Sequence, residues 1–399
     1  MDFSTPIEAF YEFIAANLRE DPKILRLKTH GKVFGFDTDF AITQIECRKK
    51  GGHKLHDFIS NPHTLFPSMV AYEQASHESV AKFHASLVTP GTSVIDMTAG
   101  LGIDSMAFAK RGCSVTSFET DRQKAEILRH NAKTLGLEKH LSVINADSTV
   151  YIKERVEKSD VIFVDPARRS ESDSRLYNMH DCAPDVLTIQ DHLLSQCDIL
   201  LIKASPLLDI SQTLRDIPST KRIWAISVEG ECKEVLTEVS PVSSLQALEA
   251  IDLRHDGSIN YRFAYSPATD SPAINYASEA DVEAGNYLYE PGPTVMKLTP
   301  WGQLQHRYPS LRKLGSSSHL FVSPQLIEDF PGRILRIQSI IDKKSRKALK
   351  GSPANVVVRN YPLSADELRK KLCVKEGKDE FIYASRLGDS PIIMKGIRI

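Results

Sequence analysis

Short apolar runs alternate with amphipathic stretches between residues 92 and 266. Apolar and β-branched side chains that favour strands fill seven of these runs: 92–97, 114–119, 141–146, 160–165, 198–203, 222–229 and 259–266. Helical spacing of apolar positions marks the stretches between the first five: 105–112, 122–136, 148–157 and 183–196. This alternation predicts an α/β fold with a doubly wound, seven-stranded, mostly parallel sheet.

The segments on either side of this region have other patterns. Residues 1–65 are polar and mainly helical in character, with a hairpin-like piece near 30–46, and a helix is predicted over 72–88. Residues 266–285 are rich in Pro, Ser, Ala and acidic residues, which is typical of a boundary. Beyond it the pattern predicts an α+β unit with a helix at 364–372. Its strands are expected at 293–298, 319–323, 333–341, 354–360, 381–386 and 391–399.

Composition narrows the class of protein. The 399 residues are 41% apolar and 25% charged, and no run of 18 apolar residues suggests a membrane span. The start lacks the features of a signal peptide and the six cysteines include no Cys-x-x-Cys pair, so we expect a cytoplasmic protein with reduced thiols. His53 and His56 have no further ligands at metal-binding spacing, so no metal site is expected.

The net charge of −1 hides an uneven distribution. From residue 331 to the end there are 16 Lys plus Arg against 7 Asp plus Glu, a charge of +9, which leaves −10 for residues 1–330. The basic residues are densest in 333–350, with seven cations and one anion. Such a unit is either a surface for a polyanion or a solvated basic face. The short basic loop RKKGGHK (48–54) has the same two interpretations.

A glycine-rich turn follows the first strand of the alternating region. VIDMTAGLGID (94–104) passes from Asp96 through Gly100 and Gly102 to Asp104. Glycines let the backbone approach a ligand and leave helix N–H groups directed at it. The acids would repel the pyrophosphate of NAD or FAD, so a dehydrogenase is least favoured. They suit a ligand with a cationic amino-acid end, such as S-adenosylmethionine.

Acidic residues also end the next strands. Glu119, 19 residues after Gly100, is placed to bond to a ribose diol, and Asp147 is placed to accept from an adenine amino group. With Asp96 and Asp165 they end four successive strands, at the sheet edge where ligands of open α/β sheets bind. The alternative for each acid taken alone is a cap or turn residue.

Four of these segments together resemble a known family. VIDMTAGLGID, SFETD, NADS and VIFVDPARR look like the motifs of a class I S-adenosylmethionine-dependent methyltransferase, over residues 68–265. Within it, the chain is similar to the RNA-methyltransferase-like branch, in which an Asp-Pro motif closes the fourth strand. Residues 354–386 resemble the THUMP-like domain of a bacterial family of such enzymes, and 287–323 resemble the small ferredoxin-like domain that precedes it.

This resemblance implies a domain organisation, a cofactor and a substrate class. The domains would be a mainly helical segment, a methyltransferase domain, a ferredoxin-like domain and a basic THUMP-like domain, at 1–65, 66–265, 280–324 and 325–399. S-adenosylmethionine would be bound by Asp96, Thr98, Gly100, Gly102, Asp104, Glu119 and Asp147. Gln74 and Ser76 could cover it. THUMP domains bind tRNA, so the implied partner is RNA.

The loop in VIFVDPARRS (161–170) is the expected acceptor site, formed by Asp165, Pro166 and Arg168. In related amino-methyltransferases an acid and a rigid proline turn orient the target amine, and an aromatic residue stacks on the base. Ala167 and Arg168 depart from that pattern, although an arginine can stack on a base or bind a phosphate. The alternative is an exposed ion-pair loop. Lys203, at the end of the next strand, could contact a phosphate or pair with Asp165 and keep it ionised.

The leading hypothesis is an S-adenosylmethionine-dependent methyltransferase that acts on a tRNA or rRNA nucleotide. Ala167 and Arg168 favour a first alternative, a non-catalytic RNA- or partner-binding protein that keeps the fold. A second alternative is a methyltransferase for a small molecule or a protein. The particular RNA, the nucleotide and the oligomeric state stay open.

Overall fold

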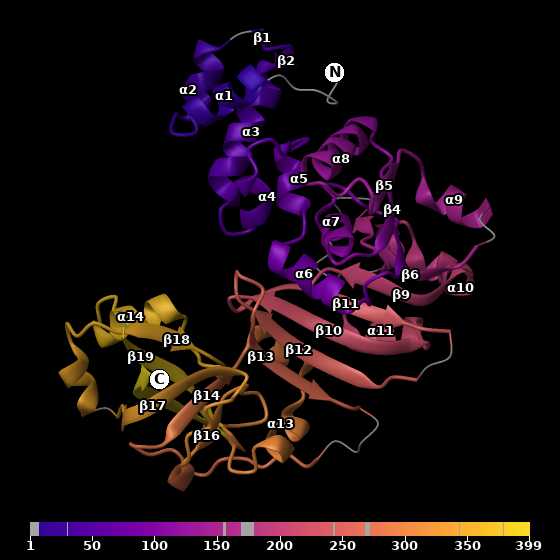
Figure 1. The fold of residues 1–399 in the computed structure, drawn as a ribbon. Coiled ribbons are helices and arrows are strands. Elements are labelled where there is room, and N and C mark those ends of the chain that lie inside the picture. Colours follow the sequence, from indigo (N-terminus) through magenta and orange to yellow (C-terminus); the bar gives the residue numbers. More distant parts are fainter. Residues whose placement is uncertain are drawn as a thin grey trace. The chain divides into compact units, whose positions relative to one another are not determined.

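The computed structural model describes residues 8–29, 31–154, 157–168, 179–241, 244–267, 272–342, 344–377 and 379–399, and of Arg168 it describes the backbone alone (Figure 1). The chain divides into two compact units. The first unit contains Met1–Glu229, Lys233–Leu245 and Leu253–Asn260. The second unit contains Gly230–Cys232, Gln246–Asp252 and Tyr261–Ile399.

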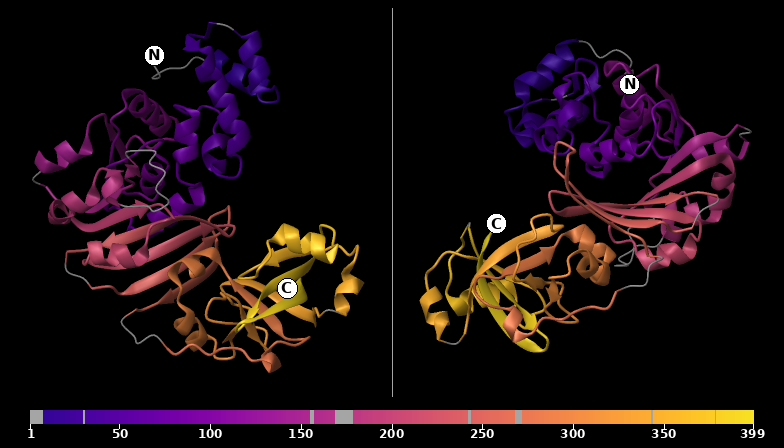
Figure 2. Two further views of the ribbon diagram at one scale, coloured as in Figure 1. Left: turned by 180° about the vertical axis from the view of Figure 1, so that it is seen from behind. Right: turned by 60° about the horizontal axis from the view of Figure 1, so that its bottom comes forward.

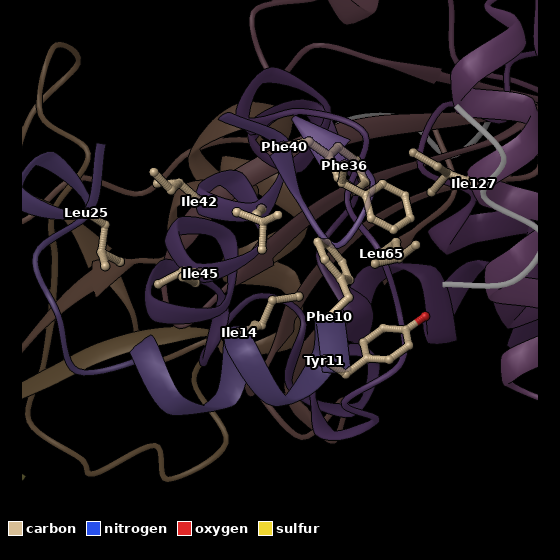
Figure 3. Close-up of a cluster of buried hydrophobic side chains, with 12 residues drawn as sticks. Phe10, Tyr11, Ile14, Leu25, Phe36, Phe40, Ile42, Ile45, Leu65 and Ile127 are labelled. Carbon is tan, nitrogen blue, oxygen red and sulfur yellow. The ribbon is translucent and has the colours of Figure 1, made fainter. Parts of the chain in front are cut away.

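The first unit begins with helices and a short hairpin, but the piece predicted to be hairpin-like near 30–46 is a hairpin only over 32–37, because residues 38–46 belong to a helix. These elements are α1 (Glu8–Asn17), α2 (Pro22–Lys28), β1 (Lys32–Val33), β2 (Phe36–Asp37), α3 (Thr38–Gly51) and α4 (His56–Ser60). Their apolar side chains form a buried cluster, in which the rings of Phe10 and Phe36 lie 4.4 Å apart between centroids (Figure 3). Ile127 of α8 (Arg122–Thr134) belongs to the same cluster. Asn131 of α8 also bonds to both the backbone N–H and the carbonyl of Leu65, at 2.8 Å each. The N-terminal helices are therefore anchored on α8.

A parallel sheet forms the centre of the first unit. Seven of its strands follow the order β10-β11-β9-β6-β3-β4-β5. Their bounds are β3 Ser93–Asp96, β4 Ser114–Phe118, β5 Leu141–Ile144, β6 Ser159–Val164, β9 Cys197–Ala204, β10 Thr220–Val228 and β11 Glu231–Val239. The five strands from β9 to β5 are parallel, and β11 runs antiparallel to β9. The predicted doubly wound, mostly parallel sheet is confirmed. Its carboxyl ends meet at one edge, and the strands have the usual twist (Figure 2).

One strand of this set differs from the sequence prediction. Segment 259–266 is indeed a strand, β13 (Ile259–Tyr265), but it falls mainly in the second unit, whereas β11 was not predicted. Strand β11 is hard to recognise because Glu234, Thr237 and Glu238 interrupt its apolar residues, and all three are nevertheless buried. Buried polar side chains break the period-two pattern on which strand prediction depends.

Helices connect the strands of the first unit. They are α5 (Met69–Gln74), α6 (Glu78–Ser86), α7 (Ile103–Lys110), α8, α9 (Ser148–Glu154), α10 (Val186–Gln196) and α11 (Ile210–Asp216). The single helix predicted over 72–88 is wrong, because the chain forms α5 and α6 there. Ala75 has an extended conformation that ends α5, and His77 starts α6 by accepting a hydrogen bond from the Ser79 N–H.

The second unit is an α+β unit, as predicted. Its seven-stranded sheet has the order β15-β16-β14-β17-β20-β19-β18, in which β18 and β19 are parallel and every other neighbouring pair is antiparallel. The strands are β14 Tyr287–Pro291, β15 Arg312–Lys313, β16 Phe321–Ser323, β17 Gly332–Ile340, β18 Asn355–Val358, β19 Glu380–Leu387 and β20 Ser390–Arg398, and β12 (Ala247–Leu253) lies mainly in this unit too. The helices are α12 Pro293–Leu298, α13 Trp301–Arg307 and α14 Ala365–Leu372.

Two helices of the second unit test the sequence prediction. Helix α14 is found where it was predicted, and Ser364 and Glu367 form its capping box. The strand predicted at 293–298 is wrong, because this segment is α12. Pro293 occupies the first turn of α12, where its missing N–H costs nothing and its φ suits a helix. The apolar composition of this segment suits a strand, whereas Pro293 favours the first turn of a helix.

A buried carboxylate crosslinks the second sheet. Glu290 of β14 is 4% exposed. Its Oε1 accepts from Arg359 Nε at 2.7 Å, and its Oε2 accepts from the Tyr383 hydroxyl at 2.7 Å. Arg333 contributes a longer ion pair of 3.6 Å. Since β14 and β19 are not neighbours in the sheet, Glu290 connects strands that share no backbone hydrogen bonds.

We expect Glu290→Gln to lower the free energy of unfolding by about 2 kcal/mol, because it removes the charge that satisfies Arg359 and Tyr383. Urea denaturation of the full chain measures this effect. The matched control is Glu283→Gln, at an exposed position of the same unit, which should change stability by less than about 0.5 kcal/mol. Equal stabilities of the two variants would contradict this role of Glu290.

Candidate active site

The glycine-rich turn between β3 and α7 requires both of its glycines. Gly100 has a φ of 56° and Gly102 a φ of 85°, in the left-handed region that favours glycine. A Cβ on Gly102 would also lie 2.1 Å from Cδ1 of Leu128 in α8, which is too close for any side chain. The positive φ and the contact with Leu128 therefore both favour a glycine at position 102.

Asp96 holds this turn in place through hydrogen bonds to its backbone and to helix α7. Its side chain is 1% exposed, its Oδ1 accepts from the Thr98 N–H at 3.0 Å, and its Oδ2 accepts from the Ser105 hydroxyl. Ser117 donates in turn to Ser105 at 2.7 Å. Burial raises the pKa of Asp96 to about 7, although the hydrogen bonds from Ser105 and Thr98 oppose the rise. The carboxyl group is thus poised to gain or lose a proton near neutral pH.

The acids at the ends of β4 and β5 are held by their own local backbone. Glu119 accepts from the Asp121 N–H at 2.8 Å, through Oε1. Asp147 accepts through Oδ1 from the N–H and the hydroxyl of Thr149, at 2.8 and 2.7 Å. These bonds fix the direction of both carboxylates at the carboxyl edge of the sheet.

A single cavity of about 780 Å³ joins these groups. It contains six of the seven residues predicted to bind the cofactor: Thr98, Gly100, Gly102, Asp104, Glu119 and Asp147. Asp96 is not exposed in the cavity and acts on it through the Thr98 backbone. Gln74, Ser76 and Asp165 also line the cavity. The volume is within the usual range for a cofactor site.

The Asp-Pro loop is tied directly to the glycine-rich turn. The N–H of Asp165 donates to the Thr98 hydroxyl at 2.7 Å. Pro166 is buried and lines a second cavity of about 340 Å³, which Asp165 lines as well. Ala167 continues into β7 (Ala167–Arg168), which pairs antiparallel with β8 (Cys182–Ala183). The side chain of Arg168, predicted to contact the acceptor, lies outside the described residues.

Lys203, at the end of β9, pairs with Asp165. Its Nζ donates to Asp165 Oδ2 at 2.6 Å and to Ser76 Oγ at 2.8 Å. Of the two contacts that the sequence left open for Lys203, the pairing is the one found. Burial lowers the pKa of Lys203, but the surrounding carboxylates, Asp165 first among them, outweigh it and hold the pKa above its usual value. Lys203 therefore stays protonated and presents a fixed charge to Asp165.

Sequence reasoning missed two residues of this buried network. The His84 Nδ1 lies 2.8 Å from Asp104 Oδ1, and its Nε2 lies 2.6 Å from Glu234 Oε1. Ser76, named only as a residue that could cover the cofactor, donates to Asp104 while accepting from Lys203. One signal was available for His84, because it follows Val80 by four residues on the buried face of α6. Glu234 lies in the strand that was not predicted.

The charges in this network stabilise each other. Burial alone lowers the pKa of His84, but Glu234 and Asp104 outweigh it and raise the pKa to about 9. Burial raises the pKa of Asp104, yet the hydrogen bond from His84 and the charge of Lys203 lower it to about 2. At neutral pH the network therefore contains a protonated His84 between two carboxylates. The contacts with His84 and Ser76 therefore fix the Asp104 carboxylate at the edge of the cavity.

Three family models match the chain. Residues 36–177 match a model described as "Putative SAM-dependent methyltransferase", residues 287–331 a ferredoxin-like domain and residues 332–395 a THUMP domain-like model. A crystal structure described as that of a "putative methyltransferase from Porphyromonas gingivalis W83" is 26% identical, with a TM-score of 0.84 and coverage of 98% of this chain and 97% of that one.

Two curated relatives add to this. An uncharacterised S-adenosylmethionine-dependent methyltransferase of Mycobacterium tuberculosis is 22% identical over 363 residues, which is 89% of this chain and 94% of the relative. Ribosomal RNA small subunit methyltransferase J of Hydrogenovibrio crunogenus is 35% identical over 92 residues. That match spans 21% of this chain and only 33% of the relative's length.

The strand order and the position of the large cavity at the carboxyl ends of the strands are those of the class I S-adenosylmethionine-dependent methyltransferase fold. The chain carries this methyltransferase domain together with a ferredoxin-like and a THUMP-like domain, and S-adenosylmethionine is its cofactor. No helix within the described ranges is long and apolar enough to cross a membrane. Among the residues that the structure describes, no three His, Cys, Asp or Glu side chains are placed to hold a metal ion.

The charge on His84 should make stability depend on pH. Its folded pKa, about 9, lies above its unfolded value, so its contribution is complete below about pH 6.5 and is lost as the pH rises through 9. We expect a loss of roughly 3 kcal/mol over this range, from 1.36 kcal/mol per pKa unit. His84→Gln should lack this part of the pH dependence in urea denaturation. Parallel curves for the wild type and the variant would refute the assignment.

Proposed function

We propose that this methyltransferase acts on RNA, with its acceptor nucleotide in the second cavity. The observation that supports this acceptor site is that Asp165 lines both the 780 Å³ cavity and the 340 Å³ cavity. A group held by Asp165 from the smaller cavity faces the larger one. Methyl transfer needs mainly such an alignment of the two reactants, because correct placement supplies most of the rate enhancement.

The larger cavity suits S-adenosylmethionine. The bound cofactor supplies an electrophilic methyl group next to a positive charge, and the carboxylates at this sheet edge match that charge. We assign the methionine end to the turn with Thr98, Gly100 and Gly102, supported by Asp96 and Asp104. Glu119 is assigned to the ribose and Asp147 to the adenine. The missing side chain at Gly100, with nothing within 4 Å of its Cβ position, leaves room for close approach.

Asp165, Pro166 and Lys203 are proposed to orient the acceptor. Lys203 holds one carboxylate oxygen of Asp165, Oδ2, and the bond from the Asp165 N–H to Thr98 fixes the loop. Asp165 then serves as a hydrogen-bond acceptor for an N–H of the substrate and does not need to act as a strong base. For Arg168 we keep the predicted contact with the base or the backbone.

RNA as the substrate class rests on the second unit and on one relative. The exposed Lys344, Lys347 and Lys350 lie in or beside the most basic stretch of the chain, within the segment that matches the THUMP-like model. The relative from Hydrogenovibrio crunogenus is named for ribosomal RNA. Basic surfaces of this kind bind phosphates.

Binding of S-adenosylmethionine should depend on pH through Asp96. A bound cation favours the ionised carboxyl group, whose pKa without cofactor is about 7. The affinity measured by calorimetry should therefore rise as the pH rises toward 7, by up to about tenfold per pH unit, and level off above it. Asp96→Asn should bind more weakly and show no such dependence. If Asp96→Asn bound the cofactor as tightly as the wild type, with the same pH dependence, the assigned effect of Asp96 on cofactor binding would be refuted.

Transfer of labelled methyl groups to RNA tests the function itself. We expect incorporation from labelled cofactor into total RNA of cells that lack the protein. Asp165→Asn should lower the rate by roughly a hundredfold with little change in cofactor binding, because it loses the charge that pairs with Lys203 and orients the acceptor. Asp191→Asn, at an exposed position on α10, is the matched control.

Two outcomes of this experiment would support other functions. No incorporation despite tight cofactor binding would favour a non-catalytic binding protein, consistent with Ala167 and Arg168.

Substitution of Lys344, Lys347 and Lys350 together by alanine should weaken transfer to RNA. A rate unchanged by this triple substitution would favour a small-molecule or protein substrate.

A further inference from the structure

Three histidines stack beside the acceptor cavity, although they come from distant parts of the sequence. His53 lies in the turn after α3, His77 precedes α6, and His255 follows β12. The ring centroids of His53 and His255 are 5.3 Å apart, and those of His255 and His77 are 5.5 Å apart. His53 and His255 are exposed, whereas His77 is buried. The stack therefore offers an imidazole surface to solvent.

The hydrogen bonds of His77 set the proton positions in this stack. Its Nδ1 accepts from the Ser79 N–H at 3.2 Å, which leaves the ring proton on Nε2. This Nε2 faces Nδ1 of His255 at 3.4 Å. A neutral His255 that accepts this bond through Nδ1 would carry its own proton on Nε2, where it can donate to a ligand.

Two lysines belong to the same region. Lys54 is next to His53, and its carbonyl accepts from the Glu78 N–H at 3.0 Å, beside His77. Its ammonium donates to the carbonyls of Tyr72 and Glu73, at 2.9 and 2.7 Å. Lys233 lines the acceptor cavity together with Lys203 and Asp165. The basic surface is thus continuous with the cavity.

These positive groups are close enough to repel each other. Burial, followed by the charges of Lys203 and Lys233, lowers the pKa of Lys54 to about 8. Burial, followed by His255, Lys233 and Lys54, lowers the pKa of His77 to about 4. The nearby carboxylate of Glu73 pairs with Lys50, at 3.7 Å. An anion bound here would relieve this repulsion.

We propose that the surface formed by His53, Lys54, Lys233 and His255, with the buried His77 packed against His255, binds a backbone phosphate of the RNA strand whose acceptor nucleotide enters the second cavity. The inference rests on the proposed function and adds a second RNA contact, within the methyltransferase unit itself. A phosphodiester accepts hydrogen bonds from ammonium and imidazole N–H groups, which are the groups present. Residues 48–51 of the basic segment RKKGGHK belong to α3, but His53 and Lys54 at its end thereby gain a role that the sequence left open.

The same residues are less suited to bind a metal ion than a phosphate. The imidazole planes of neighbouring rings are inclined by only 34° and 23°, so their nitrogen atoms do not converge on a point. The lysine charges would also repel a cation. The chemistry of this surface therefore favours an anion.

Binding of a fluorescent single-stranded RNA of twelve nucleotides tests the proposal, measured by anisotropy between 50 and 200 mM salt. We expect Lys233→Met with His255→Ala to weaken binding about fivefold or more at the lower salt concentration. The slope of log affinity against log salt should fall by about 0.7 for each phosphate that the double variant no longer neutralises. Phosphates bound by the second unit contribute equally to wild type and variant, so they cancel in this difference.

Three further variants make the test specific. Lys233→Arg should retain wild-type binding, because it keeps the charge. Lys139→Met, at an exposed position of the same unit, should leave the salt slope unchanged. Lys54→Met is a less suitable test variant, because the Lys54 ammonium also donates to two backbone carbonyls, so its loss would disturb the local fold as well as RNA binding. An unchanged slope in the double variant, or an equal loss in Lys139→Met, would overturn the proposal, as would a wild-type chain that does not bind the RNA.

The proposal and the proposed function can fail separately. Binding of S-adenosylmethionine by the double variant shows whether the fold is intact. A wild-type chain that binds RNA through this surface but transfers no methyl group would refute the catalytic function and leave the phosphate site standing. Methyl transfer with a wild-type salt slope in the double variant would refute the phosphate site alone.

Discussion

The site depends on the hydrogen bonds that the ammonium group of Lys203 donates to Asp165 and Ser76. This ammonium group lies in a buried position where an unpaired charge would cost several kcal/mol. Its bonds to Asp165 and Ser76 join the Asp-Pro loop to the segment between α5 and α6, and Ser76 donates in turn to Asp104. Removal of one charged member leaves another charge buried without its partner. These bonds fix the position of Asp165 relative to the glycine-rich turn, which is the kind of alignment that the proposed methyl transfer needs.

Much of the fold could be predicted because its residues obey local rules. The strands that lead to Asp96 and Asp165 contain short apolar runs, Val94–Ile95 and Val161–Val164, and parallel strands of this kind are buried on both faces. The glycines at positions 100 and 102 are informative for a similar reason, since their backbone angles exclude most other residues. Where a position is constrained by its own backbone or by one neighbouring strand, a single sequence is sufficient.

The rest depends on contacts between residues far apart in the chain. His84 and Glu234 are 150 positions apart, and neither is distinctive locally: one is a histidine on a helix, the other an acid in a strand with a broken pattern. The histidine stack likewise combines His53, His77 and His255. Segment 293–298 shows the opposite error, in which an apolar composition outweighed the proline that starts a helix. Long-range electrostatic partners leave no periodic signal, so the buried network is visible only in the folded chain.

Helix α8 contacts both the N-terminal helices and the glycine-rich turn, which lie in different segments of the sequence. Ile127 packs into the cluster of the N-terminal helices, while its neighbour Leu128 lies against Gly102 of the cofactor turn. Consecutive residues of a helix point in directions about 100° apart, so one helix serves both contacts. One rigid helix therefore supports both the N-terminal cluster and the glycine-rich turn, and a substitution that displaces α8 would disturb both contacts at once.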